Sequence, residues 1–285
     1  MYEKHFGLSE PPFGLTPNTR YFLRAPSHAD AIELLQVALR EREGFIKVTG
    51  EVGTGKTLLC RLLLNTLTRL EKEKGGVATA YIPNPSLAPA ELYEAVADEL
   101  SVPLPEAVNN HRLLKALNTD LIRRARLGQR VVLVIDEAQS MPEETLEALR
   151  LLTNLETESE RLLQVVLFGQ PELDETLSRS NLRQLSQRIT FSHWLQPLDS
   201  TAVSRYLQHR LTRAGYDGAE LFEASAVKQL ARASGGVPRL LNILAHKCLL
   251  AAWGEGAVTV NRGHAIRAIR DTSGLKTGRI LERWL

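Results

Sequence analysis

The stretch at residues 50–57, GEVGTGKT, constrains the fold of this chain more than any other feature. It matches the pattern G-x-x-x-x-G-K-[ST], follows a β-forming run at 45–49 and opens a helical pattern at Lys56. The glycines let backbone N–H groups wrap around an anion, and the helix start adds partial positive charge. We expect Lys56 to reach the β- and γ-phosphates of a nucleotide and Thr57 to hold Mg²⁺. The expected loop consists of Gly50, Glu51, Val52, Gly53, Thr54, Gly55, Lys56, Thr57 and Leu58.

The composition is that of a soluble globular protein. Of 285 residues, 44% are hydrophobic and 24% charged, and 35 basic against 33 acidic residues give a net charge of +2. Bulk charge therefore excludes a polybasic nucleic-acid binder. The two cysteines, Cys60 and Cys248, lack metal-ligand spacing and suit a reducing compartment. The N-terminus lacks the apolar core of a signal peptide, and the longest uncharged run, 75–90, contains three prolines. We expect a cytoplasmic protein without a membrane span, which reaches membranes, if at all, through partners.

Strand and helix patterns alternate up to Pro197. Helical patterns start at Ser27, in a capping-box arrangement, at Lys56, near Ala90 and His111, and at Ser140, where Leu146, Leu149, Leu152 and Leu155 follow. This alternation predicts an α/β fold with a parallel sheet flanked by helices. The predicted strands are residues 45–49, 77–82, 131–135, 162–168 and 189–192.

After Pro197 the patterns are helical only, which predicts a separate all-α domain. The predicted helices are residues 201–214, 224–233, 239–253 and 261–270. From Arg262 to the end, six basic and two acidic residues give the terminus a positive charge. This basic end suits an acidic partner, a membrane surface or nucleic acid, or is simply a solvated terminus. We therefore expect a nucleotide-binding core at 1–197, a helical lid at 198–270 and a basic tail at 271–285.

Two carboxylates follow the predicted strand 131–135. A carboxylate at the carboxyl end of such a strand faces the nucleotide crevice of an open α/β sheet. We expect Asp136 to hold the Mg²⁺ shell and Glu137 to act as general base on the attacking water. The alternative is an acidic helix N-cap.

Together, the phosphate loop, the Asp136-Glu137 strand end and the helical C-terminal region resemble AAA+ ATPases. More specific segments resemble the ExeA/GspA group, ATPases of type II secretion and related pilus systems; these are residues 1–2, 5–8, 12–13, 50–60, 136–139 and 169–173. A further set is most similar to the MshM-type ATPases of MSHA pilus biogenesis, namely residues 45–60, 81–85, 155–158 and 163–173. The similarity covers about residues 1–270. Longer ExeA-type proteins continue into a transmembrane helix and a peptidoglycan-binding region, so the end of this sequence at Leu285 favours the short MshM-like type.

The resemblance implies further site residues. Gln170 occupies the sensor 1 position, where a polar side chain orients the attacking water; the alternative is a turn-capping amide. Arg239 occupies the sensor 2 position at the start of a lid helix, where it would contact the γ-phosphate; the alternative is a surface arginine. Arg188, with Arg183 as the reserve, would supply an arginine finger to a neighbouring subunit, unless it is an ordinary surface charge. Phe6, Pro12 and Phe13 form either an adenine pocket or simple core packing.

The resemblance also implies a function. The expected protein is an oligomeric ATPase, a ring or a nucleotide-dependent assembly, that binds ATP or ADP with Mg²⁺. It would act as an assembly factor on an inner-membrane component of an MSHA-type pilus or a type II secretion-like machine. One alternative is a DNA-associated AAA+ ATPase of transposition or replication. Another is a scaffold that binds ATP but turns it over too slowly to do work.

Overall fold

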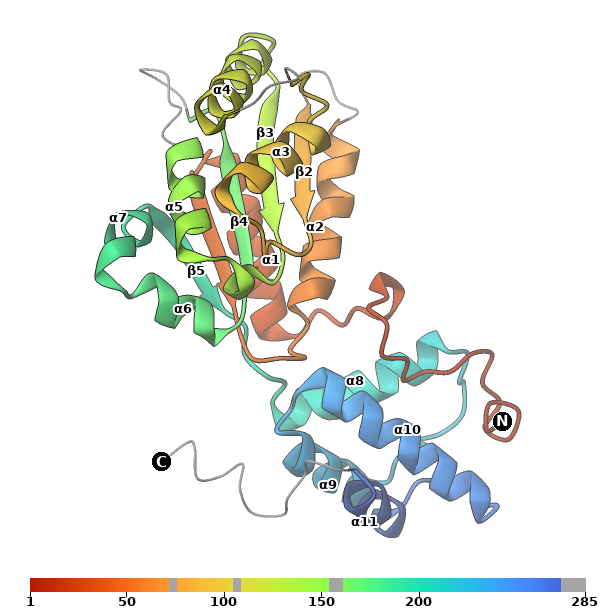
Figure 1. Cartoon of the computed structure of the whole chain (residues 1–285). Coiled ribbons are helices and arrows are strands. Elements are labelled where there is room, and N and C mark those ends of the chain that lie inside the picture. Colours follow the sequence, from red (N-terminus) through yellow and green to blue (C-terminus); the bar gives the residue numbers. More distant parts are fainter. Residues whose placement is uncertain (72–75, 105–108, 154–160, 273–285) are drawn as a thin grey trace. The chain divides into compact units, whose positions relative to one another are not determined.

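The computed structural model describes residues 1–71, 76–104, 109–153 and 161–272. The chain divides into two compact units (Figure 1). The sheet unit comprises Pro26–Glu51 and Lys56–Gln196, and the helical unit comprises Met1–Ala25, Val52–Gly55 and the chain from Pro197 onward. Within the described ranges, no helix has both the length and the apolar stretch that crossing a membrane requires.

Five parallel strands form the centre of the sheet unit, in the order β2-β3-β4-β1-β5. Each lies within two residues of its predicted position, so the expected parallel sheet is confirmed. Because the strands are parallel, the residues that follow β1, β3 and β4 lie at one edge of the sheet. The strands are β1 (Phe45–Thr49), β2 (Val77–Ile82), β3 (Arg130–Ile135), β4 (Gln164–Gly169) and β5 (Ile189–Trp194).

Helices cover both faces of this sheet, as an α/β fold requires. In Figure 1, α3, α4 and α5 lie in front of the sheet, and α1 and α2 lie behind it. The helices of the unit are α1 (Pro26–Arg40), α2 (Lys56–Glu71), α3 (Pro89–Glu99), α4 (Asn110–Arg126), α5 (Glu143–Leu152), α6 (Pro171–Leu177) and α7 (Arg183–Ser186), with short 3₁₀ turns η2 (Ala138–Ser140) and η3 (Ser180–Leu182).

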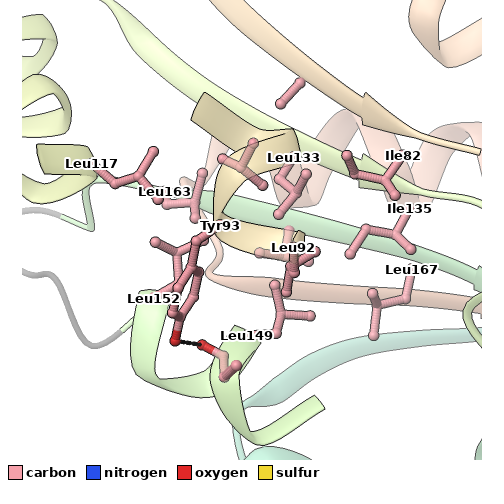
Figure 2. Close-up of a cluster of buried hydrophobic side chains, with 14 of the residues drawn as sticks. Ile82, Leu92, Tyr93, Leu117, Leu133, Ile135, Leu149, Leu152, Leu163 and Leu167 are labelled. Atoms are coloured by element: carbon pink, nitrogen blue, oxygen red, sulfur yellow. Dashed lines mark hydrogen bonds between the residues drawn. The ribbon is translucent and has the colours of Figure 1, made fainter. Parts of the chain in front are cut away.

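The apolar core of the sheet unit explains why these strands are so hydrophobic. All residues of β3 after Arg130 are buried, because helices cover the strand on both sides. On the front face, Leu133 and Leu167 pack with Leu92 of α3 and Leu149 of α5 (Figure 2). Tyr93 lies among them, and its hydroxyl donates a hydrogen bond of 3.0 Å to the Ala148 carbonyl (Figure 2). This packing fixes the strand ends that carry Asp136 and Glu137.

Two predicted helix starts are wrong. Helix α1 begins at Pro26, and the Ser27 hydroxyl does not cap it but accepts a 2.9 Å hydrogen bond from the Gln196 N–H. Helix α5 begins at Glu143, and the Ser140 hydroxyl donates to the Glu137 carbonyl instead. In both cases a tertiary or turn contact takes the hydroxyl that the local pattern assigns to a cap. Leu155, expected in the same helix, lies outside the described residues.

The helical unit contains the four helices predicted after Pro197. Their apolar faces form one core that includes Cys248. Residues 273–285, most of the expected basic tail, lie outside the described part of the chain. The helices are α8 (Ser200–Arg213), α9 (Ala224–Ser234), α10 (Pro238–Gly254) and α11 (Arg262–Arg270).

The first 25 residues pack with this helical core, whereas the sequence-based division places them with the sheet. Phe6 and Phe13 are both buried in it, and the Phe13 ring meets Phe222 edge to face at 5.9 Å. Buried Arg210 of α8 donates to the Pro12 carbonyl at 2.6 Å and lies over the Tyr21 ring. The structure therefore places Phe6, Pro12 and Phe13 in core packing, the second of the two readings that the sequence left open.

Candidate nucleotide-binding site

The phosphate loop joins β1 to α2, as its pattern predicts. Gly53 and Gly55 have φ angles of +81° and +110°, which favour glycine, and Lys56 is the first residue of α2. The Lys56 ammonium donates to the carbonyls of Gly50 at 2.6 Å and Glu51 at 2.9 Å. Burial lowers the pKa of Lys56, against the opposing charges of Glu137 and Asp136. A phosphate group could replace these carbonyls as the partner of the ammonium.

Asp136 follows β3 and is 4% exposed. Its N–H continues the sheet ladder by donating to the Ile82 carbonyl at 3.0 Å, which fixes the backbone here. Burial, followed by the charge of Glu137, raises the pKa of Asp136, whereas hydrogen bonds from the Glu137 N–H and the Thr57 side chain lower it. The structure thus joins the two residues predicted to hold the metal.

Glu137 is held by two amide side chains. Its φ of +52° is unusual for a residue with a Cβ. Its Oε2 accepts hydrogen bonds from Gln139 Nε2 at 2.6 Å and from Gln170 Nε2 at 3.0 Å. Burial raises the pKa of Glu137, but these two bonds and the charge of Lys56 outweigh burial and bring it below the ordinary value. Glu137 is therefore a carboxylate at neutral pH.

Gln139 is the site residue that sequence reasoning missed. Besides binding Glu137, its Oε1 accepts a 3.0 Å hydrogen bond from the Gln170 N–H, so it ties the end of β3 to the end of β4. Gln170 is the N-cap of α6 by position, but its side chain makes no capping bond and turns to Glu137. The segment 136–139 carried the family resemblance, and nothing in it separated Gln139 from its neighbours. Only the adjacency of β3 and β4 reveals its position.

Arg188 and Arg183 are not part of this cluster. Arg188 precedes β5, at the sheet edge opposite the phosphate loop, and its guanidinium donates to the Thr153 hydroxyl at 3.5 Å. Arg183 is exposed at the start of α7. This arrangement leaves Arg188 remote from the loop of its own chain.

Arg239 lies at the start of α10, in the same unit as Val52–Gly55. Its backbone N–H donates to the Gly53 carbonyl at 3.2 Å. A Cβ at position 53 would lie 2.7 Å from the Cβ of Arg239, so only glycine fits here. The middle of the phosphate loop is thus in direct contact with the predicted sensor helix.

The donor set fits Mg²⁺. Within the described ranges, no group of three His, Cys, Asp or Glu side chains could hold a metal ion by itself. Mg²⁺ bound with nucleotide takes one or two protein oxygens and completes its shell with phosphates and water. The Thr57 hydroxyl and the buried Asp136 carboxylate offer such a pair.

Comparisons with known proteins agree with this geometry. Residues 39–177 match the AAA domain family. The chain is 41% identical over 276 residues to General secretion pathway protein A of Aeromonas hydrophila, covering 97% of this chain and 49% of that protein. The chain therefore spans about half the length of this curated relative.

Solved structures share the fold. Cdc6p of Pyrobaculum aerophilum superposes with a TM-score of 0.70 at 17% identity, over 91% of this chain and 70% of its own. The Thermotoga maritima RuvB Holliday junction branch migration motor gives 0.56 at 15% identity, over 86% and 67%. Residues 39–177 therefore match the AAA domain family and share the P-loop fold of these structures, in a chain similar over nearly its whole length to about half of General secretion pathway protein A.

Proposed function

We propose that this chain is an ATP-driven assembly factor for a secretion or pilus machine, with Glu137 as the general base of ATP hydrolysis. The observation that carries the proposal is the position of the Glu137 carboxylate. It is ionised, held by Gln139 and Gln170, and lies within electrostatic reach of Lys56 at the same sheet edge. A second, ionised carboxylate beside Asp136 is what activation of an attacking water requires.

Each residue of the site has its own role in ATP hydrolysis. Loop N–H groups and the Lys56 ammonium bind the phosphates, and Lys56 gives up its bonds to the Gly50 and Glu51 carbonyls to do so. Glu137 accepts a proton from water as the water oxygen attacks the γ-phosphorus, and the bond to the bridging oxygen breaks to release ADP. Gln170, which donates to the Glu137 carboxylate, helps to orient that water.

Mg²⁺ fits the oxygens of Thr57 and Asp136, and it would neutralise phosphate charge when bound. Burial raises the pKa of Asp136, and a cation bound beside this carboxylate would favour its ionised form. Leu58 and Val52 belong to the same loop region and contribute backbone rather than side-chain chemistry.

We further propose that the protein acts as an oligomer. Arg188, at the opposite sheet edge, would complete the site of a neighbouring subunit, with Arg183 as the reserve. Arg239 would transmit the state of the nucleotide through its contact with Gly53. The 41% identity to General secretion pathway protein A supports a secretion-type partner. The finer assignment, a cytoplasmic MshM-like ATPase of an MSHA-type pilus that acts on an inner-membrane component, rests on the sequence resemblance.

The test is capture of the partner in the ATP-loaded state. The Glu137→Gln variant keeps the hydrogen-bonding shape but cannot accept a proton, so it should bind ATP and remain loaded. With ATP, this bait should retain an inner-membrane component of a pilus or secretion system. Glu144→Gln, an exposed residue of α5, is the matched control and should release the partner as the wild type does. Retention of DNA alone would replace the proposal with the DNA-associated alternative.

A further inference from the structure

The helical unit, which contains α8 and α9 (Figure 1), has a groove between the start of α8 and one face of α9. Its volume is about 740 Å³, which lies in the range of cavities that hold a ligand. Every residue that lines the groove belongs to the helical unit, so its shape does not depend on the sheet unit. We call it the α9 groove.

One face of α9 forms the longest wall of the groove. The lining positions on this helix and at its C-terminal end recur at helical spacing, so they share a face. Within this face, Val227 and Ala231 are half-buried and pack against the core of the unit. The wall extends for about 16 Å, a length that suits another helix better than a compact ligand. Its residues are Ala224, Val227, Lys228, Ala231, Arg232 and Gly235.

The other walls leave room for a backbone to approach. Ser200 and Ser204 lie one turn apart on α8, and both are exposed. Gly236 lines one end of the groove, where a Cβ would lie 2.0 Å from the Leu198 carbonyl oxygen, so only glycine fits. Small residues at a contact let two helices pack at a short distance. The α9 groove therefore suits the apolar stripe of another helix.

The cations of the groove have no ionic partner. Lys228 and Arg232 are exposed, lie one turn apart on α9, and form no ion pair within the described part of the chain. Like charges at this spacing repel each other, so a carboxylate beside each of them would be favourable. Two nearby carboxylates are engaged elsewhere, because Asp199 accepts a 2.6 Å bond from an N–H of α8 and Glu223 accepts a 3.4 Å bond from a neighbouring serine. Glu220, the one acidic residue among those that line the groove, precedes α9, whereas the two cations lie in its second and third turns.

The chain itself offers no matching helix. Residues 273–285 contain three basic residues and one acidic residue, so they bring the same sign of charge as the two cations. Within the described ranges, a helix exposes at most one large apolar side chain, as Val37 in α1, Leu151 in α5 and Trp253 in α10. A second copy of the chain therefore presents no apolar helical stripe to the groove.

We propose that the α9 groove binds an amphipathic helix of a partner protein that carries two carboxylates one turn apart beside its apolar stripe. The stripe would pack on Val227 and Ala231, and the carboxylates would meet Lys228 and Arg232. Exposed ion pairs add little affinity each, so these pairs would mainly select the partner. No residue that lines the groove belongs to the nucleotide site, and the proposal therefore does not depend on ATP hydrolysis.

The test is fluorescence anisotropy of two labelled helical peptides with the full chain. Both peptides are about 15 residues long and carry the same leucine stripe. The acidic peptide has Glu at positions i and i+4 beside the stripe, and the basic peptide has Lys at the same two positions. The wild type should bind the acidic peptide at least about tenfold more tightly than the basic peptide, and added salt should reduce this difference.

Charge reversal in the groove should reverse this preference. Lys228→Glu/Arg232→Glu should bind the basic peptide more tightly than the acidic peptide. The matched control is Arg213→Glu/Arg262→Glu, two exposed residues of the same unit that do not line the groove, and it should keep the wild-type preference. Ala231→Trp fills the groove and should weaken binding of the acidic peptide at least about tenfold. Unchanged thermal unfolding would show that the variants are folded.

An unchanged preference for the acidic peptide in Lys228→Glu/Arg232→Glu would overturn the proposal. So would wild-type affinity in Ala231→Trp, or failure of the wild type to bind the acidic peptide. A synthetic peptide of residues 273–285 is the third probe. If it binds more tightly than the acidic peptide and Ala231→Trp abolishes its binding, the groove belongs to the end of the chain itself. If Ala231→Trp abolishes self-association, the groove belongs to a second copy, and either result would replace the proposal.

Discussion

At the scale of single residues, the site depends on how the Glu137 carboxylate is held. Glu137 has a φ of +52°, a backbone conformation that is unfavourable for a residue with a Cβ. The Gln139 and Gln170 amides converge on its Oε2 and so limit the directions in which the carboxylate can point. We infer that Gln139 is a positioning residue, because it acts through Glu137 and the backbone of Gln170.

Gln139→Ala should therefore change both the rate and the pH dependence of hydrolysis. Loss of the 2.6 Å bond leaves Glu137 with one amide, and we expect kcat to fall about tenfold. That bond also lowers the pKa of Glu137, so its removal should raise this pKa. The base is active when ionised, so activity should be lost on acidification at a higher pH than in the wild type. Steady-state kinetics over a pH series measure both effects.

Gln139→Glu and Gln36→Ala separate this role from a general loss of stability. Gln36 is an exposed residue of α1, so its substitution should leave the profile unchanged. The glutamate variant places a like charge beside Glu137 and should move the acid side of the profile further upward. A tenfold loss of kcat with an unshifted profile would show that Gln139 only supports the fold.

The sequence predicted some of these site residues but not others. The positions of Lys56, Thr57, Asp136 and Glu137 followed from one motif and one strand end, because both are local in sequence. Gln139 did not follow, because its role depends on a hydrogen bond from the Gln170 N–H, 31 residues away at the end of a neighbouring strand. Phe6 and Phe13 could equally have been core or pocket, since an aromatic side chain has the same sequence signature in both.

At the scale of elements, the parallel sheet separates two kinds of site residue. Gly50 follows the end of β1, whereas Arg188 precedes the start of β5, and Phe45 is paired with Ile189. The length of β1 therefore lies between them, about 13 Å at the usual rise per residue. Arg188 thus lies too far from the loop of its own chain to act there, which is why we propose that it acts on the loop of another subunit.

Arg188→Ala should lower turnover roughly 10³-fold while ATP binding remains. Mixing it with Lys56→Ala, which has a defective loop but an intact arginine, should restore part of the activity, because a mixed assembly contains a working loop beside a working Arg188. Phosphate release over a series of mixing ratios measures this rescue. If the mixture releases phosphate no faster than the two variants do separately, Arg188 does not act on a neighbouring subunit. The same series with Arg183→Ala in place of Arg188→Ala tests Arg183.

The elements themselves were predictable where burial decides them. The run VVLVI at 131–135 is a strand because helices cover both of its faces, and no other element accommodates such a run so well. Helix starts were less predictable. The hydroxyls of Ser27 and Ser140 have capping chemistry, but the Gln196 N–H and the Glu137 carbonyl take them in the folded chain. The first contact is tertiary and the second is a local turn, and the capping pattern reveals neither.

At the scale of the whole molecule, the division into two units follows the change from mixed to purely helical patterns near Pro197. The assignment of residues 1–25 did not follow from that pattern. These residues pack with a core formed by the end of the chain, and Arg210 donates to the carbonyl of Pro12, nearly 200 residues away in sequence. The loop residues Val52–Gly55 group with the helical unit through contacts such as Gly53 with Arg239, a relation that the loop motif alone does not contain.

The most direct measurement of the central claim is single-turnover phosphate release from ATP by the wild type and by Glu137→Gln, with nucleotide binding measured on the same samples. We predict equal ATP binding by the two proteins, release of phosphate by the wild type, and a loss of at least about 10²-fold in the variant. Equal rates of release in the two proteins would contradict the account, because the base would then lie elsewhere.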